Sequence, residues 1–223
     1  MRIEIKIPYN LNNVHTIEGN LESLKNLRQH HPTRKINSIY FDNLNNQIAR
    51  DNINGISKRC KFRIRHYGDD QESNCYLEIK KKLNKFGFKK IIDMQSKISD
   101  VKLNEVFLLN NKIYKEVIND SYGKEYIFQD FMSPQVLVSY SRDYFIVDKI
   151  RITHDKAISF EPFGIDKLST QKKINDYLNV LEIKFDYENL NDAQHILQKI
   201  QAKPKRFSKY LRGLSFFNSS IYI

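Results

Sequence analysis

Most of the chain alternates between apolar and polar residues with a period of two, which predicts β-strands because successive side chains of a strand point to opposite faces. The clear segments are 2–8, 34–42, 57–67, 74–82, 134–146, 149–155 and 180–186. A weaker strand is expected at 88–93. Strands with one apolar and one charged face are typical of antiparallel sheets, so the pattern predicts an antiparallel β protein.

Two segments instead carry apolar residues three and four positions apart, which predicts amphipathic helices. The first covers 11–27, and the second covers 193–200, with Asn191 as its expected N-cap and Gln194 as the capping-box partner. A further helix is expected within 97–130, where the periodicity is mixed. Because such helices lie against a sheet, the fold class expected is α+β.

The charge balance limits the classes of partner. The 37 Lys and Arg against 26 Asp and Glu give a formal net charge of +11, which favours nucleic acid, membrane surfaces or phosphate chains. The first ten residues place charges inside their only apolar run, and no stretch approaches the roughly 18 apolar residues of a membrane span. A soluble, cytoplasmic protein with reduced Cys60 and Cys75 is therefore expected. No repeat or Pro/Gly-rich linker divides the sequence, so we predict a single domain over 1–223.

The charged faces of the strands carry both signs. Segment 59–65 is the clearest case, because Arg59, Lys61, Arg63 and Arg65 share one face and apolar residues occupy the other. Four cations on alternate residues repel one another unless carboxylates or a bound anion lie among them. The corresponding residues of the other strands are Arg2, Glu4 and Lys6; Tyr76, Glu78, Lys80 and Lys82; Tyr140 and Arg142; Arg151, Thr153 and Asp155; and Glu182 and Lys184.

Two interpretations of these faces are open. On a single strand, the commoner meaning of such alternation is a sheet with its apolar face on the core and its charged face in solvent. Six such strands together favour a second interpretation, in which the sheet curls into a barrel, helices cover its outside and the charged faces line a basic tunnel. Arginine binds phosphate oxygens through two N–H groups and lysine binds them as a point charge, so this tunnel suits a phosphate chain.

Three carboxylates on these faces, Glu4, Glu78 and Glu182, have two candidate roles. They neutralise neighbouring cations, or they hold Mg²⁺ or Mn²⁺ that bridges phosphate oxygens. The metal role is favoured for Glu182, and the two roles are weighed equally for Glu4 and Glu78.

Eight short motifs occur in an order that spans nearly the whole chain. They are EIK (4–6), SIYFDN (38–43), FRIRHYG (62–68), LEIKKK (77–82), SYSRDYF (139–145), RITHD (151–155), VLEIKF (180–185) and RFSKYLRG (206–213). Together they resemble the VTC (vacuolar transporter chaperone) domain, the polyphosphate polymerase branch of the triphosphate tunnel metalloenzymes, which is related to CYTH domains. The motifs at 38–43, 62–68 and 206–213 are the most specific.

The resemblance implies a closed eight-stranded antiparallel β tunnel that transfers the terminal phosphate of a nucleoside triphosphate, with ATP expected, to a growing polyphosphate chain. It implies Mn²⁺ or Mg²⁺ as cofactor, and polyphosphate or pyrophosphate as further ligands. The catalytic residues that it implies are Lys80, Arg142, Arg151 and Lys209. The phosphate-binding residues that it implies are Lys6, Arg63, Arg65, Lys89, Tyr140 and Ser208. The metal ligand that it implies is Glu182, with Glu78 and Glu4 as further candidates.

The sequence departs from the related CYTH hydrolases at one position. Those proteins begin with Glu-x-Glu-x-Lys, whereas Arg2 stands at the first glutamate here. A second metal site for water activation is therefore not expected. Near the fifth strand the family pattern fits Lys89 or Lys90, and we take Lys89. Ser208 and Lys209 rest on the resemblance alone.

Two other functions are compatible with a basic tunnel. One is a metal-dependent triphosphatase that hydrolyses triphosphate or a nucleoside triphosphate, and the other is a non-catalytic sensor that binds polyphosphate or nucleotide. Nucleic-acid binding is not expected, because the sequence has no recognised reader motif and no stacking platform can be assigned among its 13 Tyr and 14 Phe.

Overall fold

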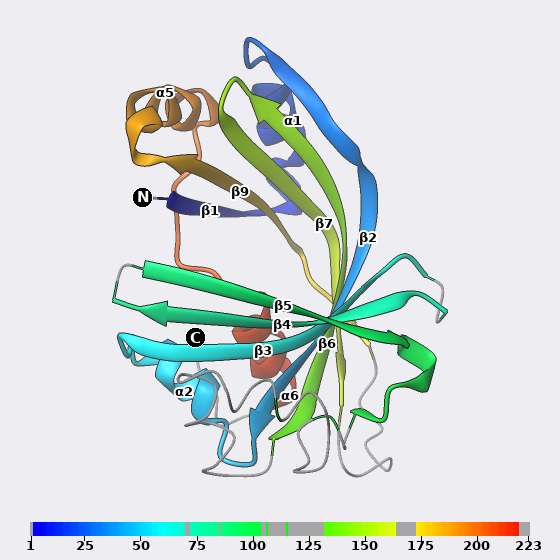
Figure 1. Ribbon diagram of the computed structural model, residues 1–223. Helices are drawn as coiled ribbons and strands as arrows, with labels where there is room; N and C mark the ends of the chain where they lie inside the picture. Colours follow the sequence, from blue (N-terminus) through cyan, green and yellow to red (C-terminus); the bar gives the residue numbers. More distant parts are fainter. Residues whose placement is uncertain are drawn as a thin grey trace. The chain divides into compact units, whose positions relative to one another are not determined.

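The computed structural model describes residues 2–69, 72–84, 86–103, 106, 115, 132–163 and 173–218. In these residues nine strands form a sheet in the order β1-β9-β7-β6-β2-β3-β4-β5, with β8 paired to β7 (Figure 1). The strands are β1 (Arg2–Asn10), β2 (Leu27–Asn43), β3 (Lys58–Tyr67), β4 (Asn74–Leu83), β5 (Phe86–Lys97), β6 (Met132–Val147), β7 (Ile150–Pro162), β8 (Ile174–Asn175) and β9 (Leu178–Asp186). The antiparallel sheet predicted from the alternation is confirmed, for example in the pairs β3–β4 and β7–β9.

The closed eight-stranded tunnel is wrong in two respects. The sheet has nine strands, and within the described residues no hydrogen-bonded ladder joins β1 to β5. The ninth strand, β8, has only two residues and is too short to show alternation. Closure cannot be predicted from alternation either, because a period of two identifies the faces of a strand but not how the ends of a sheet meet.

The helices differ from prediction at their ends. The first predicted helix begins as a 3-10 turn, η1 (Leu11–Asn13), and continues as α1 (Val14–Glu22). It ends before the predicted residue 27, because β2 begins at Leu27. The second, α5 (Leu190–Ile200), starts earlier than expected, so Asn191 lies in its first turn and Asn189 takes the N-cap position without a side-chain hydrogen bond.

Two helices in the described residues were not predicted, and these residues also form two further 3-10 turns. The helices are α2 (Gln47–Ile53) and α6 (Lys209–Phe217), and the turns are η2 (Ile98–Asp100) and η4 (Tyr187–Asn189). The helix expected within 97–130 lies mostly outside the described residues. No helix in the described part of the chain is long and apolar enough to cross a membrane.

The chain divides into two compact units. Unit 1 comprises 1–35, 139–159 and 175–208, and unit 2 comprises 36–138, 160–174 and 209–223. Strands β2, β6, β7 and β8 contribute residues to both units. The single domain stays a prediction.

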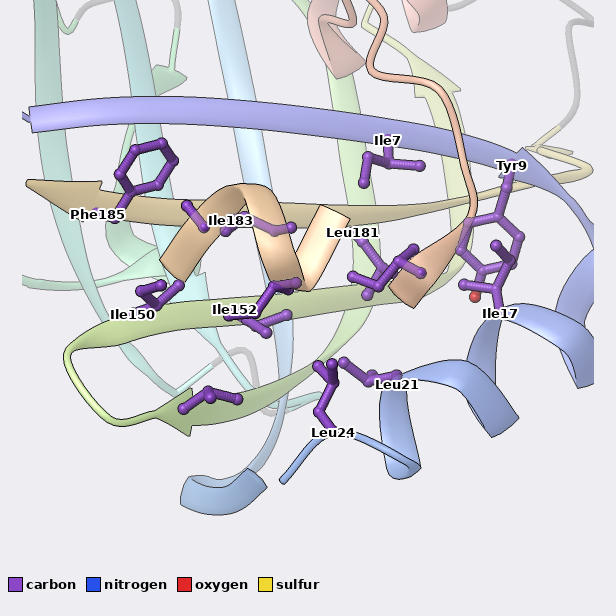
Figure 2. Close-up of a cluster of buried hydrophobic side chains, with 14 residues drawn as sticks. Ile7, Tyr9, Ile17, Leu21, Leu24, Ile150, Ile152, Leu181, Ile183 and Phe185 are labelled. Carbon is purple, nitrogen blue, oxygen red and sulfur yellow. The ribbon is translucent and has the colours of Figure 1, made fainter. Parts of the chain in front are cut away.

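The core of unit 1 lies between β1, β7 and β9 and the helices α1 and α5. Figure 2 shows its buried side chains, with Ile183 and Phe185 of β9 beside Ile150 and Ile152 of β7. These residues occupy the faces opposite Glu182, Lys184 and Arg151, as alternation requires. The apolar faces are therefore buried and the charged faces point the other way.

The core of unit 2 packs α2 and α6 against strands. Helix α6 approaches β6 and β7 closely at Gly213, where an added Cβ would lie 2.6 Å from Phe160 Cδ1 and 3.1 Å from Val136 Cγ2. Only glycine fits such an approach without displacing an aromatic ring. This packing fixes the start of α6, and with it Lys209 and Tyr210.

A strained backbone position in β7 gives a first prediction. Ala157 has φ of +49°, a left-handed conformation that costs an L-residue about 1–2 kcal/mol. Because its side chain is exposed, Ala157→Gly is expected to raise the free energy of unfolding by about 0.5–1 kcal/mol in denaturant melts. Gly68→Ala, at φ of +82°, should have the opposite sign. A loss of stability in Ala157→Gly would contradict the strain.

Buried His154 gives a second prediction. Its Nε2 lies 2.5 Å from the hydroxyl of Tyr9 in the core of unit 1. Burial and nearby Lys156 lower the pKa of His154 from 6.5 to about 4, so the unfolded chain binds this proton and the folded chain does not. Stability is therefore complete above pH 6.5 and should fall by about 3 kcal/mol as the pH drops to 4.

Denaturant melts across this pH range test the prediction. His154→Gln, which can still pair with Tyr9, should flatten the pH dependence of the free energy of unfolding. His195→Gln, on the exposed side of α5, should leave it unchanged. An unchanged slope in His154→Gln would show that another group is responsible.

Candidate functional site

A buried carboxylate, Glu78 on β4, organises the charged face of unit 2. Arg63 on β3 lies directly opposite it and contacts Glu78 Oε2 through Nε at 2.7 Å and Nη2 at 2.5 Å. Arg65 Nη1 lies 3.5 Å from Glu78 Oε1, and Lys89 Nζ donates to the same oxygen at 2.8 Å. Three cations from two neighbouring strands therefore share one carboxylate.

The charge of Glu78 is held by these cations. Burial opposes ionisation, but the positive charges of Arg63, Arg65 and Lys89 outweigh it and lower the pKa of Glu78 from 4.5 to about 2. Glu78 is thus a carboxylate at all physiological pH values. A site with three cations and one carboxylate retains positive charge, so it binds an anion more favourably than a metal cation.

Two side chains of β2 complete this arrangement. The hydroxyl of Tyr40 accepts a hydrogen bond from Arg63 Nη1 at 2.9 Å, and Ser38 Oγ accepts one from Arg65 Nε at 3.2 Å. The β2–β3 register places Tyr40 opposite Arg63 and Ser38 opposite Arg65. Sequence reasoning gave neither residue a role, although alternation in 38–42 places both on one face, because neither is charged.

Tyr40 is itself anchored. Its ring stacks on Tyr210 of α6 with centroids 5.1 Å apart, and the Tyr210 hydroxyl donates to Asp42 Oδ2 at 2.6 Å. Asp42 also accepts from the backbone N–H groups of Ile48 and Ala49, each at 2.9 Å, at the start of α2. This chain of contacts connects both helices missed by prediction to the arginines.

A row of lysines extends the same face. In the registers of β3, β4 and β5, Lys80 pairs with Lys61 on one side and with Lys89 on the other. Lys90 instead lies opposite Ile79, on the apolar face. The charge of Lys209, the first residue of α6, acts on Tyr40, so α6 brings a further cation to this cluster.

Unit 1 carries a second charged cluster, in which acids and lysines alternate across β1 and β9. The register pairs Glu4 with Lys184 and Lys6 with Glu182. Lys6 Nζ lies 3.2 Å from Glu4 Oε1 and 3.7 Å from Glu182 Oε2, and Lys184 contacts Glu182. Lys6 Nζ also donates to the carbonyl of Phe207 at 3.3 Å. Two carboxylates and two ammonium groups thus form one network.

Arg142 on β6 is paired with a buried acid of β7. Its Nε and Nη2 donate to Asp155 Oδ1 and Oδ2 at 2.5 and 2.7 Å, a two-point ion pair with a fully buried acid. Burial opposes the charge, but Tyr140 and Asp155 raise the pKa of Arg142 further above its usual value. Its guanidinium also lies over the Tyr140 ring, 5.2 Å from the centroid. Arg151 is exposed on β7, opposite Lys184.

The donors around Glu182 fit a hard divalent cation. Mg²⁺ and Mn²⁺ prefer oxygen ligands, and Mg²⁺ is commonly held by one or two carboxylates together with substrate phosphates. Glu182 and Glu4 share Lys6 and Lys184 as partners. Thr153, opposite Glu182, has a buried Oγ1 with no hydrogen-bond partner among the described residues. In the described residues no group of three His, Cys, Asp or Glu could hold a metal, so a metal here would need phosphate oxygens as well.

The predicted site residues therefore fall into two clusters. Unit 2 brings together Arg63, Arg65, Glu78, Lys80, Lys89 and Lys209. Unit 1 brings together Glu4, Lys6, Glu182 and Arg151 across β1, β9 and β7, with Arg142 and Tyr140 on β6. Ser208 is partly buried and directly precedes α6.

Comparison with protein families gives one match. The model described as the VTC domain matches residues 2–218, nearly the full length of the chain. A comparison with curated proteins finds no match.

Several solved structures share the fold. A candidate adenylyl cyclase from Hippeastrum, described as having a dominant triphosphatase activity, has 16% identity and a TM-score of 0.60, covering 100% of this chain and 98% of its own. A candidate adenylate cyclase from Bacillus halodurans has 14% identity and a TM-score of 0.56, covering 93% and 95%. The PH1819 protein of Pyrococcus horikoshii OT3 has 14% identity and a TM-score of 0.52, covering 96% and 99%. At these identities the likeness concerns the fold alone.

Proposed function

The chain belongs to the VTC domain family, and from this premise we propose that it is a polyphosphate polymerase, which transfers the terminal phosphate of a nucleoside triphosphate to a polyphosphate chain. The observation that carries the proposal is the cluster of unit 2, where Arg63, Arg65 and Lys89 surround a single carboxylate and leave a net positive charge. Phosphate chains are the polyanions that arginine and lysine bind best in such an array.

The residues have separate tasks in this proposal. Phosphoryl transfer needs alignment of donor and acceptor and neutralisation of charge on the equatorial oxygens, with little covalent chemistry from the protein. Arg63 and Arg65 hold phosphate oxygens, since Glu78 fixes both guanidinium groups before the ligand arrives. Lys80, Lys89 and Lys209 add charge from β4, β5 and α6, where the transferred group gains negative charge.

The charged residues of unit 1 form a second phosphate-binding cluster in this proposal. Lys6, Arg142 and Arg151 bind phosphate, with hydroxyl donors from Tyr140 and Ser208. Glu182 and Glu4 would hold Mn²⁺ or Mg²⁺, which neutralises phosphate charge when it is bound. We assign Glu78 to charge neutralisation and not to metal binding, because its three cationic neighbours would repel a divalent ion.

A metal-dependent triphosphatase is the second candidate. The Hippeastrum protein with the same fold is described as having a dominant triphosphatase activity, which favours this alternative. Hydrolysis requires a group that orients and activates water. In this chain Arg2 stands where the related hydrolases have the first glutamate of Glu-x-Glu-x-Lys, so the second metal site that would activate water is not expected. This replacement is our reason for preferring transfer to a phosphate acceptor.

One incubation separates the candidates. Purified protein is mixed with ATP and Mn²⁺ or Mg²⁺, and the products are resolved on gels for polyphosphate and by assay for free phosphate. A polyphosphate ladder that Arg63→Gln abolishes supports the polymerase. Free phosphate without a ladder identifies a triphosphatase, and tight ATP binding with neither product identifies a sensor. Full polymerase activity in Arg63→Gln or in Arg151→Ala would contradict the roles assigned here.

A further inference from the structure

Tyr40 has a hydroxyl group that is only half satisfied. The oxygen accepts a hydrogen bond from Arg63 Nη1 at 2.9 Å, which uses its acceptor capacity. In the part of the chain that the structure describes, this is the one hydrogen bond of the Tyr40 hydroxyl, and its own proton is not donated to any acceptor. The residue is only 8% exposed, so the surrounding protein leaves little room for bulk water to serve instead.

The contacts of the Tyr40 ring prevent it from rotating to bring its hydroxyl to another acceptor. The ring stacks on Tyr210, whose own hydroxyl is bonded to Asp42. The guanidinium of Arg63 lies 5.7 Å from the centroid of the Tyr40 ring, on a β3 residue directly opposite Tyr40. The phenol is therefore fixed at the position where Arg63 donates to it.

The charges around Tyr40 indicate which kind of acceptor its hydroxyl proton would bind most strongly. Arg63, Arg65 and Lys209 all act on Tyr40 electrostatically and lower the pKa of its phenol, although burial opposes the shift. A donor polarised by three cations binds most strongly to an anionic oxygen, and a charge-assisted O–H···O⁻ bond is among the strong hydrogen bonds of proteins. Glu78 is already bonded to Arg63 and Lys89, so among the described residues this carboxylate does not take the proton, and a bound anion would supply the oxygen.

We infer that Tyr40 is a ligand-binding residue, which donates its hydroxyl proton to a phosphate oxygen held beside Arg63. The inference rests on the proposed function, because the ligand is the same phosphate chain. It adds a neutral donor to the cationic cluster of unit 2. A neutral donor responds to the position of one oxygen rather than to the total charge of the ligand.

The test compares three variants in metal-free buffer with EDTA, using tripolyphosphate as the ligand and calorimetry to measure Kd. Tyr40→Phe removes only the hydroxyl and is expected to raise Kd by about 10-fold. Tyr187→Phe, at an exposed tyrosine of η4, should leave Kd unchanged. Tyr210→Phe should lower the melting temperature through loss of its bond to Asp42 and change Kd by less than about two-fold.

A second measurement observes the Tyr40 hydroxyl directly in the wild-type protein. Tyrosine labelled with ¹³C at Cζ reports on hydroxyl hydrogen bonding, and the Tyr40 signal is assigned as the one missing in Tyr40→Phe. Tripolyphosphate should shift this signal and leave that of Tyr187 in place. If wild type binds tripolyphosphate while Tyr40→Phe binds equally well, or the Tyr40 signal does not move, the inference is wrong and the proposed function stands. If wild type binds tripolyphosphate neither with EDTA nor with added Mn²⁺, both are wrong.

Discussion

Glu78→Gln is expected to lower the free energy of unfolding by about 4 kcal/mol, the loss that follows when one partner of a buried ion pair is removed. Arg63, Arg65 and Lys89 would then repel one another around a neutral side chain. A polyanion should relieve this repulsion, so tripolyphosphate is expected to raise the melting temperature of Glu78→Gln more than that of wild type. Denaturant melts with and without the ligand measure both effects.

A matched control is available on the surface of the same unit. Glu72 forms an ion pair with Lys97, but the side chains are 55% and 51% exposed. Glu72→Gln should therefore change stability by less than about 0.5 kcal/mol and leave the ligand effect unchanged. If Glu78→Gln is as stable as Glu72→Gln, Glu78 is not the group that holds the three cations together.

Glu78 also makes the free energy of unfolding depend on pH under acidic conditions. The folded-state pKa of Glu78 is about 2, below its ordinary value of 4.5, so the folded chain binds this proton less readily than the unfolded chain. The contribution of Glu78 is complete above pH 4.5 and is lost as the pH falls towards 2. This window overlaps that of His154 only between about pH 4 and 4.5, so most of each loss is separable in one pH series.

The strands were predictable because alternation is a local property of the sequence. Arg63 and Arg65 share a face in any strand that contains them, and the structure agrees. The partner of Arg63 was not predictable, since a face does not specify a register. Glu78 lies opposite Arg63 only because of how β3 and β4 pair, and that pairing makes it a shared counterion.

The role of Tyr40 was missed for a related reason. Charged residues on alternate positions mark a candidate binding face in a sequence, whereas Tyr40 and Ser38 act as neutral partners of arginines on the neighbouring strand. Helix α2 has seven residues, and its first turn is bonded to Asp42 at the end of β2. A helix this short depends on such tertiary and capping contacts, so its own periodicity gives almost no signal.

Glu182→Gln is expected to lower metal-dependent turnover of ATP by about 100-fold or more, because a charged oxygen ligand is lost where phosphate charge must be neutralised. The substitution keeps the size of the side chain, and its amide can still bond Lys184, so the fold should persist. Glu188→Gln, at an exposed acid of η4, is the matched control and should retain full turnover.

Metal binding itself gives a readout separate from activity. Titration of Mn²⁺ in the presence of tripolyphosphate, followed by electron paramagnetic resonance, should show weaker Mn²⁺ binding in Glu182→Gln than in wild type. Glu78→Gln should not weaken it, because removing a carboxylate from among three cations takes no ligand from the metal. Weaker Mn²⁺ binding in Glu78→Gln with unchanged binding in Glu182→Gln would move the metal to unit 2, and the assignment of the two carboxylates would have to be exchanged.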